Sequence, residues 1–429
     1  MIIRKQHIIF FTYIVLYRLL VDFCYEYIVS DVFYYWNFRR DSTLGSMSVS
    51  WLFLLTLSPL IIKTFQARGF SGAVVSMFIL VSLVPTTTLI GFSSFYDGKF
   101  VLLIYIYWLI LLMANISINV IKLPLNNSRD YFVASSILLS VCLSVVYVSF
   151  RYTGFRFQFS LIDVYQFRAE AREFEVGLLL GYLVSAADNL LPVILVYCLT
   201  IKRYFIASIL SAVIFINYGI SSTKQVIFLL MLAYFFSIFF KSREPKNYYI
   251  AGFSMLLIFS IIEWWFIGTW FLTDVFSFRL MFIPSSLHYA YFDFFSNNEL
   301  DLYRQSALRV FFDSPYKDNI QFLMGERLIG DFSARANNGL FTEAYYNLGV
   351  AGVIFIPIII VGILKFLEGA LRGLDHRVGA IFAVAATFVF MSVPFPTALL
   401  STGMLAIFLV LSFLPRNQVN VVNLEQNNN

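Results

Sequence analysis

The chain has 429 residues, of which 60% are hydrophobic and only 13% are charged, and its mean hydropathy is +0.79. A soluble surface of ordinary charge density cannot be built from this composition, so most of the surface must face lipid. The apolar runs are about 20 residues long and do not alternate, which predicts membrane-spanning α-helices and excludes a β-barrel. The net charge of +5 is spread over short loops, which excludes a nucleic-acid-binding patch.

Twelve apolar runs predict an all-α polytopic membrane protein with about twelve spans in a single domain over residues 1–415. The predicted spans cover residues 7–29, 48–66, 70–92, 100–121, 131–150, 177–200, 204–220, 224–240, 249–269, 348–366, 378–394 and 397–414. The first run contains charges and lacks a small-residue cleavage site, so it is predicted to stay attached as a span. The Asn- and Gln-rich residues 416–429 predict a disordered cytoplasmic tail.

The loops between these runs predict the orientation. Alternate loops on one side hold 15 lysines and arginines against five acidic residues, and the opposite loops hold 14 against 16. Positive loops stay in the cytoplasm, so both termini are predicted to be cytoplasmic. Two loops on the outer side are long, 151–176 and 270–347, and function is expected there. The three cysteines fall inside apolar runs without metal-ligand spacing, which predicts neither a disulfide framework nor a metal site.

The first long outer loop carries a cluster of charges. Helical spacing would put Arg168 and Arg172 on one face, which would suit an anion clamp. An amphipathic helix lying on the membrane surface, with its charges in local pairs, explains the same pattern. Lys224 follows three hydroxyl residues at the outer mouth of its span, where phosphate would suit a helix start, although a lysine that simply snorkels to the interface is equally expected.

The second long outer loop opens with an aromatic segment, from Trp270 to Phe295. A half-inserted amphipathic helix would let its rings, Tyr291 among them, line a lipid or sugar groove, with Arg279, His288 and Asp293 pointing inward. An interfacial aromatic belt without chemistry is the alternative.

Polar residues gather where this loop enters the next span. Asn337, Asn338 and Tyr345 could bind sugar hydroxyls, and Glu343 could take a proton from one. Helix capping and close packing by the Asn and Gly residues explain the same stretch. Within the first span, Arg18 and Asp22 are four residues apart, which predicts a structural ion pair that faces the bundle.

Four stretches together resemble the O-antigen polymerases of the Wzy type. They are Asp163 to Arg168, Ser221 to Lys224, Arg279 through Pro284 to Phe295, and Asn338 to Gly352. The layout, with large third and fifth outer loops, is similar to that family over the whole chain. The resemblance implies a fold similar to GT-C-type glycosyltransferases and localisation in the bacterial inner membrane.

The same resemblance implies that an undecaprenyl-diphosphate-linked glycan is transferred on the periplasmic face to the end of another lipid-linked repeat. Cations must then stabilise the diphosphate, and the candidates are Arg168, Arg172, Lys224, Arg279 and Arg309. We expect Arg279→Ala and Lys224→Ala each to abolish polymerisation. Glu343, His288 and Asp293 compete as the base for the acceptor hydroxyl. No cofactor and no metal are expected. The implied partners, besides the donor, acceptor and membrane lipid, are a Wzz-type chain-length regulator and a flippase.

Three other functions fit parts of the pattern. An O-antigen ligase would use the same donor but pass the glycan to lipid A core, and the sequence separates the two poorly. A polysaccharide flippase or other transporter leaves the outer loop of nearly eighty residues unexplained, and no internal repeat is evident. A membrane-bound acyltransferase would need a cytoplasmic His-Asp arrangement that the sequence does not suggest.

Overall fold

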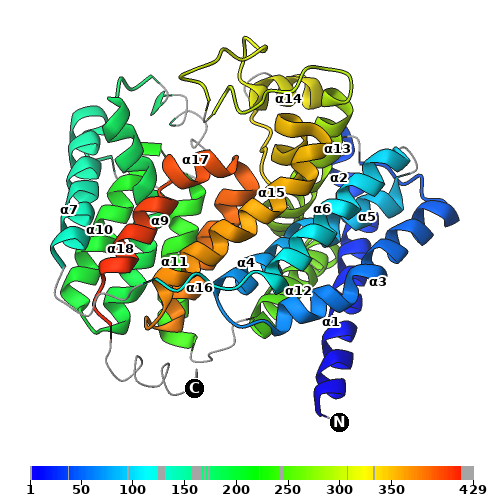
Figure 1. Cartoon of the computed structure of the whole chain (residues 1–429), viewed down its shortest axis with the longest axis horizontal. Coiled ribbons are helices and arrows are strands. Elements are labelled where there is room, and N and C mark those ends of the chain that lie inside the picture. Colours follow the sequence, from blue (N-terminus) through cyan, green and yellow to red (C-terminus); the bar gives the residue numbers. More distant parts are fainter. Residues whose placement is uncertain are drawn as a thin grey trace. The chain divides into compact units, whose positions relative to one another are not determined.

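A computed structural model describes residues 2–36, 38–93, 96–123, 131–156, 167, 170–171, 173–221, 223–240, 246–306, 308–331 and 334–416 (Figure 1). All regular structure in these ranges is helical, as predicted. The predicted tail lies almost wholly outside the described residues, and so do Arg168 and Arg172. The chain divides into two compact units, and the single membrane domain expected from the sequence stays a prediction.

A helix lies at each of the twelve predicted positions in the described part of the chain, and eight of them are long and apolar enough to span a membrane. The eight are His7–Val32, Leu44–Gln66, Phe70–Phe92, Gly98–Ser117, Phe132–Thr153, Leu178–Thr200, Tyr248–Ile267 and Phe341–Leu371. The other four, Tyr204–Ile220, Lys224–Phe239, His376–Ser392 and Met404–Phe413, are apolar but shorter than 18 residues. The chain is therefore a polytopic helical membrane protein.

The first unit comprises residues Met1–Asn119, Glu244–Ile363 and Phe390–Phe395. Its described helices are α1 (Ile2–Cys24), η1 (Tyr25–Val29), α2 (Ser30–Val32), η2 (Tyr34–Trp36), α3 (Leu44–Gln66), α4 (Phe70–Phe78), η3 (Ile79–Leu83), α5 (Val84–Phe92), α6 (Gly98–Ser117), α12 (Lys246–Ile262), η5 (Glu263–Ile267), η6 (Thr273–Phe282), α13 (Ile283–Phe295), α14 (Ile320–Ile329) and the first part of α15 (Phe341–Leu371). The continuous helix α4–η3–α5 is buried along its whole length, so it forms the core of this unit.

The second unit comprises residues Val120–Arg243, Leu364–Val389 and Pro396–Asn429. It contains α7 (Tyr131–Val148), η4 (Ser149–Thr153), α9 (Leu178–Thr200), α10 (Tyr204–Ser221), α11 (Lys224–Phe239), the end of α15, most of α16 (His376–Ser392) and α17 (Phe395–Leu400), and α18 (Met404–Phe413). The predicted last span, 397–414, is broken into α17 and α18 by the turn before Gly403, whose φ is +86°.

The segment that the sequence predicted as a half-inserted aromatic helix is helical over η6 and α13. Its rings pack inside the first unit: Phe278, Phe282, Tyr291, Phe292 and Phe295 are all buried. This segment contacts α5 and η3 of the core rather than forming a belt at the membrane surface. It therefore carries His288 into the protein interior.

Helix α15 begins earlier than the predicted span and contains a break. It starts at Phe341, and Gly349 has a non-helical backbone with φ +55° and ψ −136°. Only glycine adopts such a conformation readily, so the break separates a short first segment from the membrane helix that follows. A side chain at Gly352 would also collide with the Ala344 carbonyl, at 1.8 Å from its Cβ. Glu343 and Tyr345 therefore lie on the short segment before the break.

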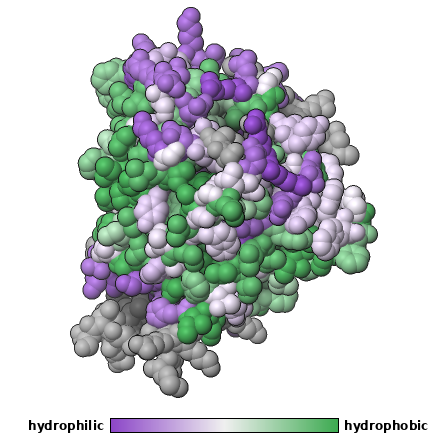
Figure 2. All heavy atoms as spheres, turned by 90° about the vertical axis from the view of Figure 1, so that its right-hand side faces the viewer, coloured by the Kyte–Doolittle hydropathy of each residue, from purple (hydrophilic) through white to green (hydrophobic). Residues whose placement is uncertain are grey.

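Figure 2 shows the side of the molecule on which α1 and α3 lie in Figure 1, with a broad hydrophobic band below a hydrophilic region at the top. Exposed apolar side chains of α1 and α3 include Leu16, Leu19, Leu52 and Leu55. Lipid is the solvent that suits this band.

Candidate functional site

The candidate site is a cluster of buried polar side chains where α15 begins. Five of the residues predicted from the sequence meet in this region of the first unit: Glu343, His288, Asn338, Tyr345 and Tyr291. Each of the five residues has an exposed fraction of 5% or less. They come from two segments of the chain: His288 and Tyr291 lie on α13, and Asn338, Glu343 and Tyr345 lie just before or on the start of α15, up to 57 residues further on. They meet because α13 packs beside the start of α15.

Glu343 is fully buried, and its two carboxyl oxygens have different surroundings. Oε1 accepts a hydrogen bond from the Tyr303 hydroxyl at 2.9 Å and from the Phe395 amide at 2.8 Å. Oε2 has no hydrogen-bond partner. A buried polar atom without a partner costs about 1–3 kcal/mol, so natural proteins keep such atoms mainly where they have a role or hold a water molecule.

Phenols surround this carboxyl. The Tyr107 hydroxyl on α6 is buried without a hydrogen-bond partner and is close enough to Glu343 to be affected by its charge. The ring of Tyr107 packs edge-on against Phe341, with the ring centres 5.9 Å apart. Burial and the nearby Glu343 carboxyl hold the pKa of Tyr303 well above its ordinary value, so Tyr303 remains a donor. Two buried polar atoms in the first unit, Glu343 Oε2 and the Tyr107 hydroxyl, are thus without a hydrogen-bond partner.

The turn that covers Glu343 has a strained backbone. Leu302 and Tyr303 both have left-handed φ values, +55° and +61°, and Leu340, directly before α15, has φ +54°. For residues other than glycine this conformation costs roughly 1–2 kcal/mol each. Such strain is found mainly where the surrounding structure enforces it, often at functional sites.

Hydrogen bonds to α15 enforce this conformation. The Tyr303 amide donates to Asn347 Oδ1 at 2.8 Å, and the Asp301 amide donates to the Tyr346 carbonyl at 3.0 Å. Asp301 is buried, and its carboxylate accepts from the Gln305 amide and the Ser314 hydroxyl. The turn is therefore fastened to the same short helix segment that carries Glu343.

His288 lies next to Glu343 in the fold but belongs to a separate hydrogen-bond set. Its Nε2 is 3.0 Å from the Ser82 hydroxyl and its Nδ1 is 2.8 Å from the Thr342 hydroxyl. Ser82 lies in the π-helical turn η3, whose wider spacing breaks the α-helical register of α4 and α5. Burial lowers the pKa of His288 to about 3, so the ring is neutral at pH 7. Both ring nitrogens are already hydrogen-bonded, which leaves Glu343 as the better-placed base.

The predicted sugar-binding side chains make internal contacts. Asn338 accepts from Gln321 and donates to the Tyr346 hydroxyl, Tyr345 pairs with the Ser296 hydroxyl, and Tyr291 donates to the Ala336 carbonyl. Asn337 is half-buried beside them. Gly339 allows close packing here, because a Cβ would lie 2.1 Å from the Phe390 carbonyl. In this conformation the first three side chains support the shape of the site.

The predicted charged residues lie outside the buried cluster. Asp293 is half-exposed and pairs with Arg327 at 3.0 Å. Arg279 is exposed and pairs with Asp274 at 3.0 Å, and Arg309 is exposed in the turn 308–311. Lys224 is exposed at the first position of α11 in the second unit. Of the five predicted cations, Arg279 and Arg309 therefore share the unit that contains Glu343.

Sequence reasoning missed Tyr303, Asp301 and Tyr107. Asp301 and Tyr303 lie in a stretch without a recognisable motif, and Tyr107 is one tyrosine within an apolar span. Their roles depend on contacts across 40 residues or more, such as Tyr303 to Glu343, which no local pattern signals. In the described part of the chain, no three His, Cys, Asp or Glu side chains form a metal-ligating group.

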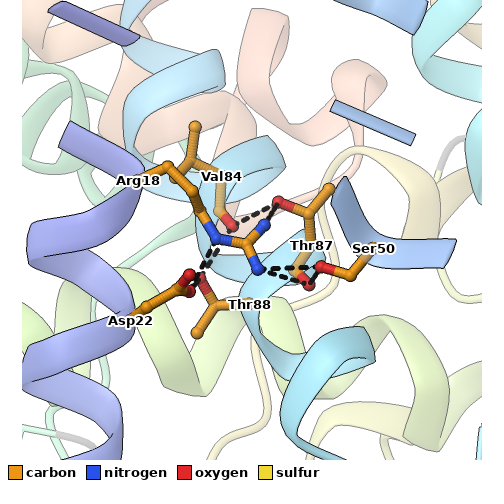
Figure 3. A network of polar contacts seen from close by, with 6 residues as sticks. All are labelled: Arg18, Asp22, Ser50, Val84, Thr87 and Thr88. Atoms are coloured by element: carbon orange, nitrogen blue, oxygen red, sulfur yellow. Dashed lines mark hydrogen bonds and ion pairs between the residues drawn. The ribbon is translucent and has the colours of Figure 1, made fainter. Parts of the chain in front are cut away.

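A second buried polar cluster lies between α1, α3 and α5 (Figure 3). Arg18 is completely buried and contacts Asp22 at 2.6 Å, as the sequence predicted. Its guanidinium also donates to the Thr87 hydroxyl and carbonyl and to the Ser50 hydroxyl, and Thr88 donates to Asp22. This set joins three helices and satisfies the charge, as a buried ion must be.

Family models, curated proteins and solved structures were compared with this chain, and none matches.

Proposed function

We propose that the chain is a membrane glycosyltransferase of the O-antigen polymerase type, with Glu343 as its base. Besides the sequence resemblance, the observation that carries this proposal is the Glu343 carboxyl, of which only one oxygen has hydrogen-bond partners. It is buried at the start of a membrane helix, has one oxygen without a partner, and lies under a strained turn. A base in a water-excluded site next to a membrane helix suits a lipid-linked substrate.

In the proposed reaction, Glu343 Oε2 takes the proton of the acceptor sugar hydroxyl. The acceptor oxygen then bonds to the anomeric carbon of the donor glycan, the bond from that carbon to the diphosphate breaks, and the diphosphate leaves with the electron pair. Charge grows on the diphosphate, and each well-placed donor there contributes on the order of 3 kcal/mol. Arg279 and Arg309 are our candidates within the first unit. Lys224, Arg168 and Arg172 stay candidates from the resemblance alone.

The proposal includes finer features of the chain. The apolar runs and the loop charges predict twelve spans and cytoplasmic termini. The resemblance implies a fold similar to GT-C-type glycosyltransferases, location in the bacterial inner membrane, and reaction on the periplasmic face. A Wzz-type chain-length regulator and a flippase are the proposed protein partners. The donor and acceptor are both undecaprenyl-diphosphate-linked glycans.

Lipopolysaccharide from a host that lacks the gene, compared with the same host complemented with it, tests the function. We expect core bearing a single repeat in the deletion strain and a ladder after complementation. Bare core, with polymer accumulating on the carrier lipid, would instead assign the chain as a ligase. An unchanged ladder in the deletion strain would refute both and favour a transporter.

A further inference from the structure

A groove of about 620 Å³ opens in the first unit between α3, the end of α5 and α6. Ligand sites in proteins typically have volumes of roughly 300–1,000 Å³, so the groove is large enough for part of a ligand. Its walls are formed by Thr43, Ser46, Val49, Leu52, Phe53 and Thr56 on one side and by Ile90, Ser93, Tyr96, Gly98, Val101, Leu102 and Tyr105 on the other.

The lining of the groove changes along its length. Hydroxyl groups of Thr43, Ser46, Ser93 and Tyr96 lie at the end where α3 and α6 begin, and mainly apolar side chains line the rest. None of the lining residues is charged. Leu52 and Leu102, on opposite walls, are 59% and 58% exposed, so the groove opens toward the lipid that surrounds these two spanning helices. Such a lining suits a hydrocarbon chain and not an anionic headgroup.

Hydrogen bonds fix the packing of α3 against α5 beside the groove. Ser46 donates a hydrogen bond to the Gly91 carbonyl at 2.9 Å, and Ser50 donates to the Thr87 carbonyl. Helices α3 and α5 approach closely here, because a Cβ at Gly91 would lie 3.0 Å from Ser50 Oγ. Figure 3 shows that Arg18 donates hydrogen bonds to both Ser50 and Thr87. The groove is therefore a fixed gap between helices.

The hydroxyl end of the groove adjoins the candidate site through aromatic rings. Tyr96 packs against Tyr289 of α13, with ring centres 4.7 Å apart. Phe100, at the start of α6, packs against Phe341, with ring centres 5.7 Å apart. Phe341 is two residues before Glu343, and Tyr289 follows His288. The groove thus leads from the lipid toward the site described above.

From this continuity we propose that the groove between α3 and α6 holds part of the polyprenyl chain of the lipid-linked donor, whose diphosphate end is directed past Tyr96 toward Glu343. This assignment rests on the proposed function. It adds a place for the lipid, and it accounts for the uncharged lining, because the diphosphate lies beyond the groove.

Photo-crosslinking of the full-length protein in lipid nanodiscs tests the groove without requiring turnover. The probe is a polyprenyl diphosphate without sugars that carries a diazirine in its chain. We expect labelled peptides from 49–56 of α3 and 101–105 of α6. Unlabelled polyprenyl diphosphate should reduce this labelling at least tenfold, and excess phosphatidylethanolamine should not.

Leu102→Trp, which fills the groove, should reduce labelling at least fivefold. Leu139→Trp on α7 is the matched control, because Leu139 is 59% exposed on a spanning helix of the second unit and lines no part of the groove. Val49→Trp, on the opposite wall, replaces Leu102→Trp if that variant is not monodisperse.

Full labelling in a monodisperse groove variant would overturn the inference, as would equal competition by phosphatidylethanolamine. If the groove is labelled but the protein restores no ladder, the polymerase function is refuted and the polyprenyl site is supported. If the protein restores the ladder but the groove is not labelled, the polymerase function is supported and the polyprenyl site is refuted.

Discussion

Two buried polar clusters in the first unit differ in one physical respect. The Arg18 cluster pairs its charges and hydrogen-bonds each nitrogen of the guanidinium. The Glu343 cluster leaves Oε2 and the Tyr107 hydroxyl without partners and lies under a turn with two left-handed residues. A buried charge whose hydrogen-bonding groups all have partners holds helices together. Buried polar atoms without partners and a strained backbone are instead typical of functional sites.

The largest expected effect is on Glu343. Glu343→Gln keeps the size of the side chain and can still accept from Tyr303, but it cannot take a proton. We expect polymerisation to fall 100-fold or more, in line with the roughly 10²–10⁴-fold contribution of a general base, while the protein level in the membrane stays normal. Quantified ladders from the complemented deletion strain measure the loss. Glu326→Gln, an exposed change on α14, is the control, and a normal ladder from Glu343→Gln would exclude Glu343 as the base.

Arg279 tests whether the site extends to an exposed cation. Arg279→Ala should reduce polymerisation about 100-fold, because one electrostatic donor to a transition state contributes on that order. Arg327→Ala is closely matched, since both arginines are about half-exposed and each pairs with one aspartate at 3.0 Å. Equal ladders from the two variants would remove Arg279 from the diphosphate site.

For the Arg18 cluster we expect a loss of stability instead. Arg18→Met leaves Asp22 buried without its partner, which typically costs about 3–5 kcal/mol. Adding Asp22→Leu removes the uncompensated charge and should restore most of the thermal stability of the purified protein and most of the ladder. A double variant that is as unstable as the single variant would show that the cluster does more than join helices.

The smallest expected effect is the pH dependence from His288. Its pKa is about 6.5 when unfolded and about 3 when folded, so below pH 6.5 the unfolded chain binds one proton more. Stability should therefore fall by about 1.4 kcal/mol per pH unit as the pH drops from 6.5 toward 3. His288→Gln should lack this part of the dependence. Melting temperatures at pH 7.5 and 5.5 measure it, and parallel shifts in both proteins would show that His288 is not buried in neutral form.

The sequence alone determined the class of protein and the position of the helices. In lipid, the backbone N–H and C=O groups of an uninterrupted apolar run can form hydrogen bonds only within the run, which favours a helix. In the described part of the chain, a helix lies at each of the twelve predicted positions. Spacing of four residues on one helix was also sufficient for the Arg18–Asp22 pair.

Only the tertiary structure decided which polar residues meet. Hydropathy carries no information on contacts between distant segments, and so it could not show that Tyr303 covers Glu343 or that Ser82 and Thr342 hold His288. An apolar pattern also does not encode the non-helical backbone of Gly349 or the close approach of Gly352 to the Ala344 carbonyl. The groove between α3 and α6 likewise depends on how two helices pack, because its lining residues are ordinary in sequence.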